Sequence, residues 1–326
     1  MRVLTITPSF PPDYTGGAEV SCYHTCRGLI SQGVHCTILS VSNRHPKRTD
    51  KWYDLDGIHV HKVRFPTQLP GGDIFDPRIY DAVRREIDTQ RPDVIHLHNA
   101  SGASLAPYAA ARKAHIPMVN TLHDHWLLCP NNMLLQRDYS VCDPGLYADR
   151  CGNCYRQFDY WAAVPNRRQL FAHMTRDALF TPPSQALIDL HVRGGYAPER
   201  FRLLRLGFAE EKLSEPVHPA VRRLQSRRDS APMVVFGGGG VDVKGGRVVL
   251  TAIPGILEKT PDARIIIAGG ITPDMTAAYR QYSPNVEVLG RVPFTDMRAL
   301  LAMADLTLMV SVWLENSPVT IFESHQ

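Results

Sequence analysis

Short apolar runs rich in β-branched residues alternate with amphipathic segments along the chain. Residues 3–8 (VLTITP) have the pattern of a buried strand, residues 18–33 that of a helix ending at a glycine, and residues 34–41 (VHCTILSV) that of the next strand. Further runs of this kind cover residues 93–99, 118–124, 178–184 and 201–207. Because near-continuous apolar strands separated by helices form parallel sheets covered on both faces, we expect an α/β fold.

A polar and basic stretch at residues 209–231 interrupts this pattern. Strand-like runs resume beyond it, at residues 233–238, 264–270, 286–292 and 306–311. The pattern predicts two doubly wound parallel-sheet domains, residues 1–208 and 232–326, joined by residues 209–231 as a linker. Within the first domain, residues 126–160 form a Cys-rich insertion of low hydrophobic content.

Composition narrows the classes of function. The chain has 326 residues, which is too long for one ordinary core and agrees with two domains. Apolar residues make up 44% and charged residues 21%, as in globular proteins, and a net charge of +4 gives no reason to expect nucleic acid as a partner. No apolar run reaches about 18 residues, and the N-terminus does not resemble a signal peptide, so we expect a cytoplasmic protein.

Four arginines, Arg222, Arg223, Arg227 and Arg228, lie close together in the linker. A solvated helix face explains such a charge run, and we expect that role. The alternative is peripheral contact with an anionic membrane surface, at the inner face of the membrane.

Two glycine-rich loops each follow the first strand of a predicted domain. In PSFPPDYTGGAE, Gly16 and Gly17 open a helix, whose unpaired N–H groups can bind a phosphate. The second loop, FGGGGVDVKGG, adds Lys244, a point charge suited to a diphosphate. The first loop lacks the dinucleotide fingerprint, and the second lacks that of a nucleoside-triphosphate loop. The alternative is an ordinary turn at the first loop and a solvent-facing lysine in a flexible turn at the second.

Histidines lie at the ends of two predicted strands. His96 and His98 end one strand, and His123 and His125 flank Asp124 at the end of the next. Alternation along a strand places each histidine pair on one face, and open α/β sheets bind ligands at the carboxyl ends of their strands. Four histidines at two such ends favour a ligand site over the alternative of satisfied core residues.

Four cysteines fall in the insertion: Cys129, Cys142, and the C-x-x-C pair of Cys151 and Cys154. Four thiolates complete a tetrahedral zinc shell and would hold together a loop that has little core of its own. The spacing matches no common zinc finger, so a set of reduced thiols is the alternative. Both interpretations, a structural zinc and free thiols, stay open.

A final pattern, LENSPVTIFES, places two carboxylates around a turn near the C-terminus. Glu315 follows a predicted strand, and Glu323 lies two turns along a helix that begins near Pro318. Carboxylates accept paired hydrogen bonds from vicinal hydroxyls, such as those of a ribose or a hexose. Taken alone, two solvent-exposed glutamates are the simpler explanation.

Together these motifs resemble those of the retaining glycosyltransferases of family 4. GGAE, DVIHLHN, VNTLHDHW and KGG resemble that family's phosphate loop, two histidine-bearing strand ends and donor loop, and Glu315 and Glu323 match its Glu-x7-Glu signature. The resemblance covers essentially all 326 residues. It implies two Rossmann-like domains facing a cleft, the type B glycosyltransferase fold. The second domain would be incomplete, because the family continues beyond the second glutamate.

The resemblance also implies roles for individual residues. In such enzymes the second domain binds a nucleotide-sugar, with Lys244 on the diphosphate, Glu323 on the ribose and the Glu315 turn on the sugar, while the histidine that His123 matches contacts the transferred sugar. The implied catalytic residues are His123, Lys244 and Glu315. The implied donor-binding residues are Gly16, Gly17, Gly238, Lys244, Glu315, Asn316, Ser317 and Glu323, and the implied acceptor-side or sugar-side residues are His98, Asp124 and His125.

The implied reaction moves a hexose-type sugar from a nucleoside-diphosphate sugar to a glycan or lipid-linked acceptor, with retention at the anomeric carbon. Surface polysaccharide or glycoconjugate synthesis is the expected context. Fixed cations and helix dipoles would stabilise the leaving diphosphate, so the transfer requires no cofactor or metal. Gly238 departs from the family, many of whose members carry an arginine at that place. A nucleotide-sugar 2-epimerase and a non-catalytic nucleotide-sugar-binding subunit are the alternatives.

Overall fold

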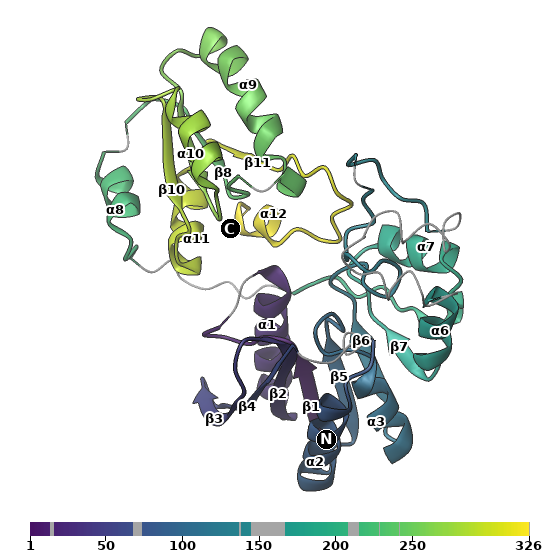
Figure 1. Cartoon of the computed structure of the whole chain (residues 1–326). Coiled ribbons are helices and arrows are strands. Elements are labelled where there is room, and N and C mark those ends of the chain that lie inside the picture. Colours follow the sequence, from purple (N-terminus) through teal and green to yellow (C-terminus); the bar gives the residue numbers. More distant parts are fainter. Residues whose placement is uncertain are drawn as a thin grey trace. The chain divides into compact units, whose positions relative to one another are not determined.

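The computed structural model describes residues 1–13, 16–67, 74–136, 138–144, 167–207, 215–227, 229–240 and 242–325. The chain divides into two compact units, Met1–Phe208 and Ala209–Gln326. Each unit is described by itself, and each has its own central sheet (Figure 1).

A seven-stranded sheet forms the centre of the first unit, with the strand order β3-β4-β2-β1-β5-β6-β7. Its strands are β1 (Arg2–Thr7), β2 (His35–His45), β3 (Thr49–Leu55), β4 (Ile58–Pro66), β5 (Val94–His98), β6 (Met118–Thr121) and β7 (Ala178–Phe180). All neighbours are parallel except β3, which pairs antiparallel with β4 at one edge. Most residues of β1 and β2 are buried, as in central strands covered on both faces.

The described helices of this unit are α1 (Gly17–Ser31), α2 (Pro77–Gln90), α3 (Ala106–Ala114), α6 (Arg167–Met174) and α7 (Gln185–Arg193), with the 3-10 turn η2 (Pro198–Arg200). Two of them begin at side-chain caps, because Asp76 accepts a hydrogen bond from Arg78 N and Ser184 accepts one from Leu187 N. Helices α2 and α3 lie side by side (Figure 1).

A four-stranded parallel sheet forms the centre of the second unit, with the strand order β10-β9-β8-β11. Its strands are β8 (Met233–Phe236), β9 (Arg264–Ala268), β10 (Val286–Gly290) and β11 (Leu306–Leu308). The described helices are α8 (Pro219–Ser226), α9 (Gly246–Lys259), α10 (Pro273–Arg280), α11 (Phe294–Met303) and α12 (Val319–Glu323), with the 3-10 turn η3 (Asp242–Lys244).

Alternation along β8 and β9 builds a core on each face of this second sheet. Val235 and Ile266 belong to a buried cluster with residues of α8 and α11. Val234 and Ile265 belong to another cluster, with residues of α9 and α10. Because successive side chains of a strand point to opposite faces, the sheet is covered by helices on both sides, as a doubly wound domain requires.

The two sheets, parallel apart from the edge strand β3, confirm the expected α/β fold, with corrections in detail. The run at residues 201–207 is wrong as a strand, since only Phe201 forms an isolated bridge, to Phe180. Leu203 and Leu204 are exposed there, so the apolar run lacks the burial that would hold it in a sheet. The β3–β4 hairpin has no counterpart in the expected series, because exposed charged residues of β3 hide its strand pattern.

Helix α8 lies within the stretch expected to be a linker. Its Val221 and Leu224 are buried in the core of the second unit, while Arg223 forms an ion pair with Glu287. Arg228 lies outside the described residues, and the membrane contact considered for these arginines stays a prediction. Over the ranges that the structure describes, no helix is both long enough and apolar enough to cross a membrane.

Candidate active site

The carboxyl ends of the parallel strands meet at one edge of each sheet, which is where open α/β sheets bind ligands. In the first unit, His98 ends β5 and His123 follows β6. In the second unit, Lys244 follows β8 and Glu315 follows β11. We refer to these two places as the first-sheet edge and the second-sheet edge.

Glycines allow the loop after β8 to pack closely against its neighbours at the second-sheet edge. Gly239 has a φ of +61°, and a Cβ atom there would lie under 3.0 Å from Gly270 O. Gly245 has a φ of +87°, and a Cβ atom there would lie under 3.0 Å from Val310 O. Any side chain at either position is therefore excluded by the left-handed backbone and by the loops after β9 and β11. Helix α9 begins directly after this loop.

One oxygen of Glu315 accepts three hydrogen bonds. Its Oε1 accepts from Lys244 Nζ at 2.7 Å, from Ser311 Oγ at 2.6 Å and from Trp313 Nε1 at 2.7 Å. Lys244 Nζ also lies 4.8 Å from the centre of the Trp313 ring, within the range of a cation–π contact. The side chain of Glu315 is 18% exposed and that of Lys244 is 39% exposed, so solvent reaches this charge-neutral pair.

Ser311 and Trp313 are site residues that sequence reasoning missed. Backbone contact ties their segment to the lysine loop, since Val312 N donates to Val243 O at 3.0 Å. The available signal was two side-chain donors placed shortly before a carboxylate in one loop. The sequence alone does not indicate that this loop lies next to Lys244, so the pattern could not be assigned to a site.

Glu323, the second glutamate of the pair, lies in a different environment at the end of α12. It is half-buried, and burial raises its pKa to about 7, while Arg298 acts in the opposite direction. Its Oε1 is buried and has no hydrogen-bond partner among the described residues. Asn316 and Ser317 lie half-buried in the turn that leads to this helix. A ligand hydroxyl that donates to Glu323 would remove the cost of an unsatisfied buried oxygen.

Gly238 has no room for a side chain. A Cβ atom there would lie under 3.0 Å from the Phe236 ring and from Cβ of Lys244. Phe236 is 2% exposed and belongs to the core of the second unit. An arginine at this place would have to displace that ring, so the loop presents Lys244 and backbone N–H groups instead.

Histidines form a hydrogen-bonded group at the first-sheet edge. His98 Nδ1 lies 3.1 Å from His123 Nε2, and His96 Nε2 lies 2.8 Å from Thr121 Oγ1. Burial lowers the pKa of His96 to about 4 and that of His123 to about 3, and it lowers the pKa of His98 well below its usual range. These rings are therefore neutral near pH 7 and act as hydrogen-bonding groups without charge. Among the residues described, none partners the buried Nε2 of His98.

Asp124 and His125 continue the chain after β6 and are placed differently. Asp124 is half-buried, its Oδ1 accepts from Trp126 N at 2.9 Å, and burial raises its pKa to about 6. His125 is 1% exposed, and its backbone N donates to Asn132 O at 3.1 Å. The structure thus leaves Asp124 accessible at the edge and places His125 inside the loop.

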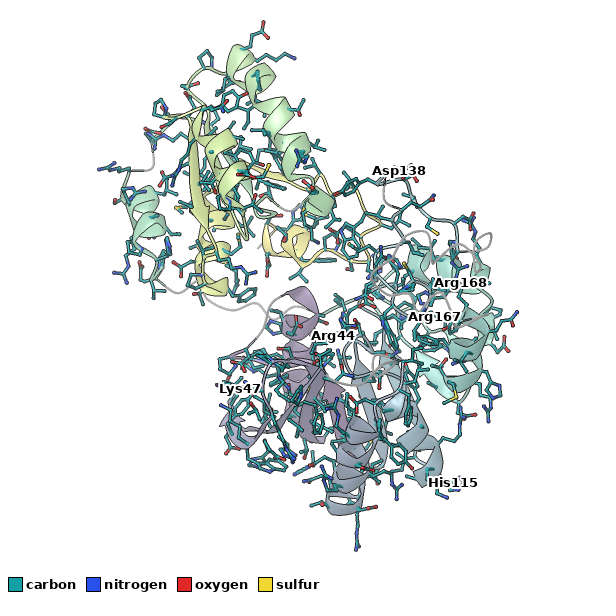
Figure 2. The ribbon with its side chains drawn as sticks, viewed as in Figure 1. Arg44, Lys47, His115, Asp138, Arg167 and Arg168 are labelled. Carbon is teal, nitrogen blue, oxygen red and sulfur yellow. The ribbon has the colours of Figure 1, made fainter. Side chains whose placement is uncertain are left out.

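Two buried arginines hold this loop in place, and the sequence pattern indicated neither of them. Arg167 Nη2 donates to Trp126 O at 2.6 Å, and Arg168 Nε donates to Leu128 O at 3.1 Å. Both side chains come from the start of α6 (Figure 2). Arg167 also opposes the effect of burial on the pKa of Asp124. Both arginines are buried and hold the loop through its backbone carbonyl groups.

Two backbone N–H groups at the start of helix α1 face the side chain of Glu19. The helix begins at Gly17, after Gly16 in an extended conformation. Burial raises the pKa of Glu19, while hydrogen bonds from the backbone N–H groups of Glu19 and Gly16 lower it. A phosphate at this helix start would have to share those donors with the Glu19 carboxylate. Donor binding by Gly16 and Gly17 stays a prediction.

The expected cysteine cluster falls only in part on described residues. Cys129 is buried with its Sγ 2.7 Å from Asn131 Oδ1, and Cys142 is half-buried. Cys151 and Cys154 lie outside the described residues, as does the whole of the insertion from residue 145 onward. In the described ranges, no group of three or more His, Cys, Asp or Glu side chains is arranged to hold a metal ion. Zinc in the insertion therefore stays a prediction.

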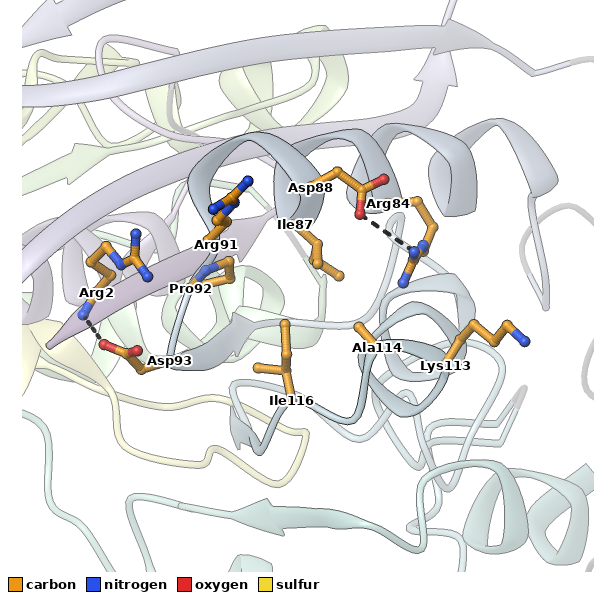
Figure 3. Close-up of a pocket in the computed structure, with 10 residues that line it drawn as sticks. All are labelled: Arg2, Arg84, Ile87, Asp88, Arg91, Pro92, Asp93, Lys113, Ala114 and Ile116. Carbon is orange, nitrogen blue, oxygen red and sulfur yellow. Dashed lines mark hydrogen bonds and ion pairs between the residues drawn. The ribbon is translucent and has the colours of Figure 1, made fainter.

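A hollow of about 640 Å³ lies at the opposite, amino edge of the first sheet. Arg84, Ile87, Arg91 and Lys113 are among the residues that line it (Figure 3). Arg84 is paired with Asp88 at 3.4 Å, and Figure 3 shows the side chains of Arg91 and Lys113 pointing apart. Because its basic groups do not converge on one point, this hollow has the character of a solvated surface.

Comparison with known sequences identifies relatives for both units. The family model for Glycosyltransferase Family 4 matches residues 15–211, and that for Glycosyl transferases group 1 matches residues 231–325. An uncharacterised glycosyltransferase of Methanocaldococcus jannaschii is 22% identical over 279 residues, which are 82% of this chain and 63% of that protein. An uncharacterised 42.6 kDa protein in the cps region of Klebsiella pneumoniae is 24% identical over 147 residues, 40% of this chain and 39% of that protein. The chain thus spans 39% and 63% of the lengths of these two curated relatives.

Solved structures show the same fold. HepE of Anabaena, in complex with UDP and glucose, is 18% identical with a TM-score of 0.66, and the match covers 99% of this chain and 78% of that one. At this level of identity the likeness concerns the fold, which is that of the type B glycosyltransferases with two Rossmann-like domains. Since the first family model alone matches residues 15–211, more than half of the sequence, the chain belongs to glycosyltransferase family 4.

Proposed function

We propose that this protein transfers a hexose-type sugar from a nucleoside-diphosphate sugar to a glycan or lipid-linked acceptor, with retention at the anomeric carbon. The observation that carries the proposal is the 2.7 Å contact between Lys244 Nζ and Glu315 Oε1 at the second-sheet edge. The fold there joins a cation suited to a diphosphate with a carboxylate suited to sugar hydroxyls. HepE, which is similar in fold, was crystallised with UDP and glucose.

The second unit would bind the donor. Lys244 carries three N–H groups and directs one at Glu315, so the others can contact the diphosphate. The start of α9, a helix of 14 residues, adds backbone N–H groups and the positive end of its dipole. Glu323 would accept hydrogen bonds from the ribose, which would satisfy its buried Oε1. Fixed positive groups of this kind stabilise the charge that develops on the leaving diphosphate, and the proposed step needs no metal.

The transfer breaks the bond between the anomeric carbon and the diphosphate oxygen, and it forms a bond to the acceptor oxygen on the same face of the sugar. The acceptor hydroxyl gives its proton to the departing phosphate oxygen, so the step balances without a further reagent. The transition state has oxocarbenium character. The protein orients the two substrates and stabilises the leaving group.

The first unit would hold the acceptor and the transferred sugar. His98 and His123 are neutral because burial lowers their pKa values, so each can donate and accept hydrogen bonds with hydroxyl groups. Asp124 offers a carboxylate at the same edge, with a pKa that burial raises to about 6. Hydrogen-bonding groups of this kind suit a hydroxyl-rich glycan, as in the synthesis of surface polysaccharides or glycoconjugates.

Titration calorimetry with a panel of nucleotide-sugars tests donor binding, and NMR of the product's anomeric configuration tests retention. A tight-binding nucleotide-sugar whose sugar moves to an added acceptor with retention would support the proposal. Conversion of the donor to its C2 epimer without an acceptor would instead identify a nucleotide-sugar 2-epimerase. Binding without any turnover would identify a non-catalytic subunit, and no binding would contradict the proposal as a whole.

A further inference from the structure

We propose that Arg291 is a second cation of the donor site and binds the diphosphate together with Lys244. The proposal rests on the donor-binding function argued above and adds to it a residue that supplies positive charge. A nucleoside diphosphate carries several negative charges, and a site that binds it benefits from cations not neutralised by the protein itself.

Charge in the loops at the second-sheet edge is almost fully paired. Lys244 faces Glu315 at 2.7 Å, and Arg247, at the start of α9, faces Asp242 at 2.9 Å. Arg291 is the other cation in the loops that follow the four strands. It is exposed, and within the described residues its guanidinium has neither a hydrogen-bond partner nor an ion-pair partner. Arg291 therefore supplies the unneutralised positive charge of this edge.

The position of Arg291 brings it next to the glycine loop. Strand β10 ends at Gly290, so Arg291 is the first residue beyond the strand. Its Nε and Nη2 atoms lie 3.5 Å and 3.6 Å from the place that a Cβ atom on Gly270 would take. Gly270 O accepts a hydrogen bond from Gly240 N at 3.0 Å, which joins the turn after β9 to the glycine loop after β8. The guanidinium thus lies beside the turn that supports the glycine loop.

The space around the two loops explains why the cation comes from β10. At Gly238 the Phe236 ring fills the volume that a side chain would need, so no arginine can project from the glycine loop there. Strand β10 lies two places from β8 in the sheet, which is about 10 Å at the usual strand spacing. An extended arginine together with a diphosphate covers that distance. The planar guanidinium binds phosphate oxygens in pairs and keeps its charge at any physiological pH.

Titration calorimetry on the full chain, with UDP and GDP as probes, tests this role. Arg291→Ala should weaken binding of the diphosphate roughly tenfold or more, because charge-assisted hydrogen bonds to phosphate are lost. Arg291→Lys should recover part of that affinity, since lysine restores the positive charge but lacks the paired N–H donors of the guanidinium. Arg280→Ala is the matched control, because Arg280 is exposed in the last turn of α10, at the opposite edge of the same sheet. Its affinity should equal that of the parent.

Comparison of UDP with UMP, and of GDP with GMP, distinguishes a phosphate contact from a contact with the nucleoside. The loss in Arg291→Ala should be larger for the diphosphate, and the salt dependence of diphosphate binding should decrease. Equal losses for diphosphate and monophosphate would assign Arg291 to the nucleoside and overturn the proposal, as would unchanged affinity. If the alanine variant fails to fold, Arg291→Gln removes the charge with a side chain of similar length. A parent protein that binds no nucleotide would overturn the donor function itself, whereas a parent that binds and does not depend on Arg291 would overturn only this role.

Discussion

At the first-sheet edge, His98 and His123 share a contact of 3.1 Å between two neutral rings. At the second-sheet edge, Lys244 and Glu315 share one of 2.7 Å between two charged groups. Both lie at the carboxyl ends of parallel strands, so the type of sheet does not explain the difference. Exposure to solvent explains the difference. Burial lowers the pKa values of the histidines and makes them neutral, whereas the side chain of Lys244 is 39% exposed and forms an ion pair with Glu315.

This difference indicates what each edge can recognise. Neutral donors and acceptors form hydrogen bonds with hydroxyl groups. They do not suit a charged group, because a charge that is buried without a partner costs more free energy than a neutral polar group does. Charged groups that solvent can reach form strong, charge-assisted hydrogen bonds with phosphate. Loss of a histidine at the first-sheet edge should therefore affect sugar transfer and leave phosphate binding unchanged, whereas loss of Lys244 at the second-sheet edge should weaken phosphate binding.

The largest effect is expected from His123→Ala. If His123 contacts the transferred sugar, turnover should fall roughly a hundredfold, the usual cost of removing one transition-state hydrogen bond. Affinity for the bare nucleoside diphosphate should stay within about twofold of the parent, since His123 is expected to contact the sugar and not the nucleotide. Steady-state kinetics and calorimetry measure the two quantities. His115→Asn, at the exposed C-cap of α3 (Figure 2), is the control and should behave like the parent. If His123→Ala lost both turnover and nucleotide affinity, the two edges would not be chemically separate.

Lys244→Ala, at the second-sheet edge, should instead weaken binding of the bare nucleoside diphosphate. Loss of a charge-assisted contact with the diphosphate should weaken nucleoside diphosphate binding by about 10- to 100-fold. Calorimetry measures this directly. Lys259→Ala, at the far end of α9, removes the same charge away from the loop and should change nothing. Equal affinities of Lys244→Ala and the parent would contradict a diphosphate contact by this lysine.

The two glutamates should separate within the second-sheet edge. Glu323→Gln should weaken nucleoside diphosphate binding several-fold, because an amide accepts fewer hydrogen bonds from ribose hydroxyls than a carboxylate does. Glu315→Gln should bind at least as tightly as the parent, since Lys244 loses its counter-charge, and it should lower turnover of the intact donor. Calorimetry combined with a transfer assay measures both. If neither variant differs from the parent, the pair has no part in the reaction.

The smallest effect concerns pH. Burial raises the pKa of Glu323 to about 7, and the carboxylate must be ionised to accept two ribose hydroxyls. Below pH 7 a proton must leave before the nucleotide binds, so affinity should fall as the pH drops and should level off above pH 7. His98 and His123, whose pKa values are lowered, stay neutral throughout this range. Calorimetry from pH 6 to pH 8 on the parent and on Glu323→Gln measures this effect. The variant retains only the titration of the nucleotide phosphate, so identical pH profiles for the two proteins would contradict a role of Glu323 ionisation.

Periodic and local features were predictable from the sequence. The two sheets follow from apolar runs such as those around Val235 and Ile266, because burial on both faces demands continuous apolar strands. The glycine-rich turn that contains Gly239 and Gly245 was also visible in the sequence, since glycine readily adopts the positive φ angles found there. In contrast, the run that contains Leu203 and Leu204 has the composition of a strand, but these two side chains are exposed and the run forms no strand.

By itself, the sequence determined the α/β class, the glycine loops and the spacing of Glu315 and Glu323, since these depend on neighbours along the chain. Only the tertiary structure decided that Arg167 and Arg168 are buried supports and that Ser311 and Trp313 donate to Glu315. It also decided which groups keep their charge. The physical reason is that a pKa depends on burial, as at His98 and His123. A hydrogen bond likewise depends on partners brought together by the fold, such as Lys244 and Glu315, 71 residues apart.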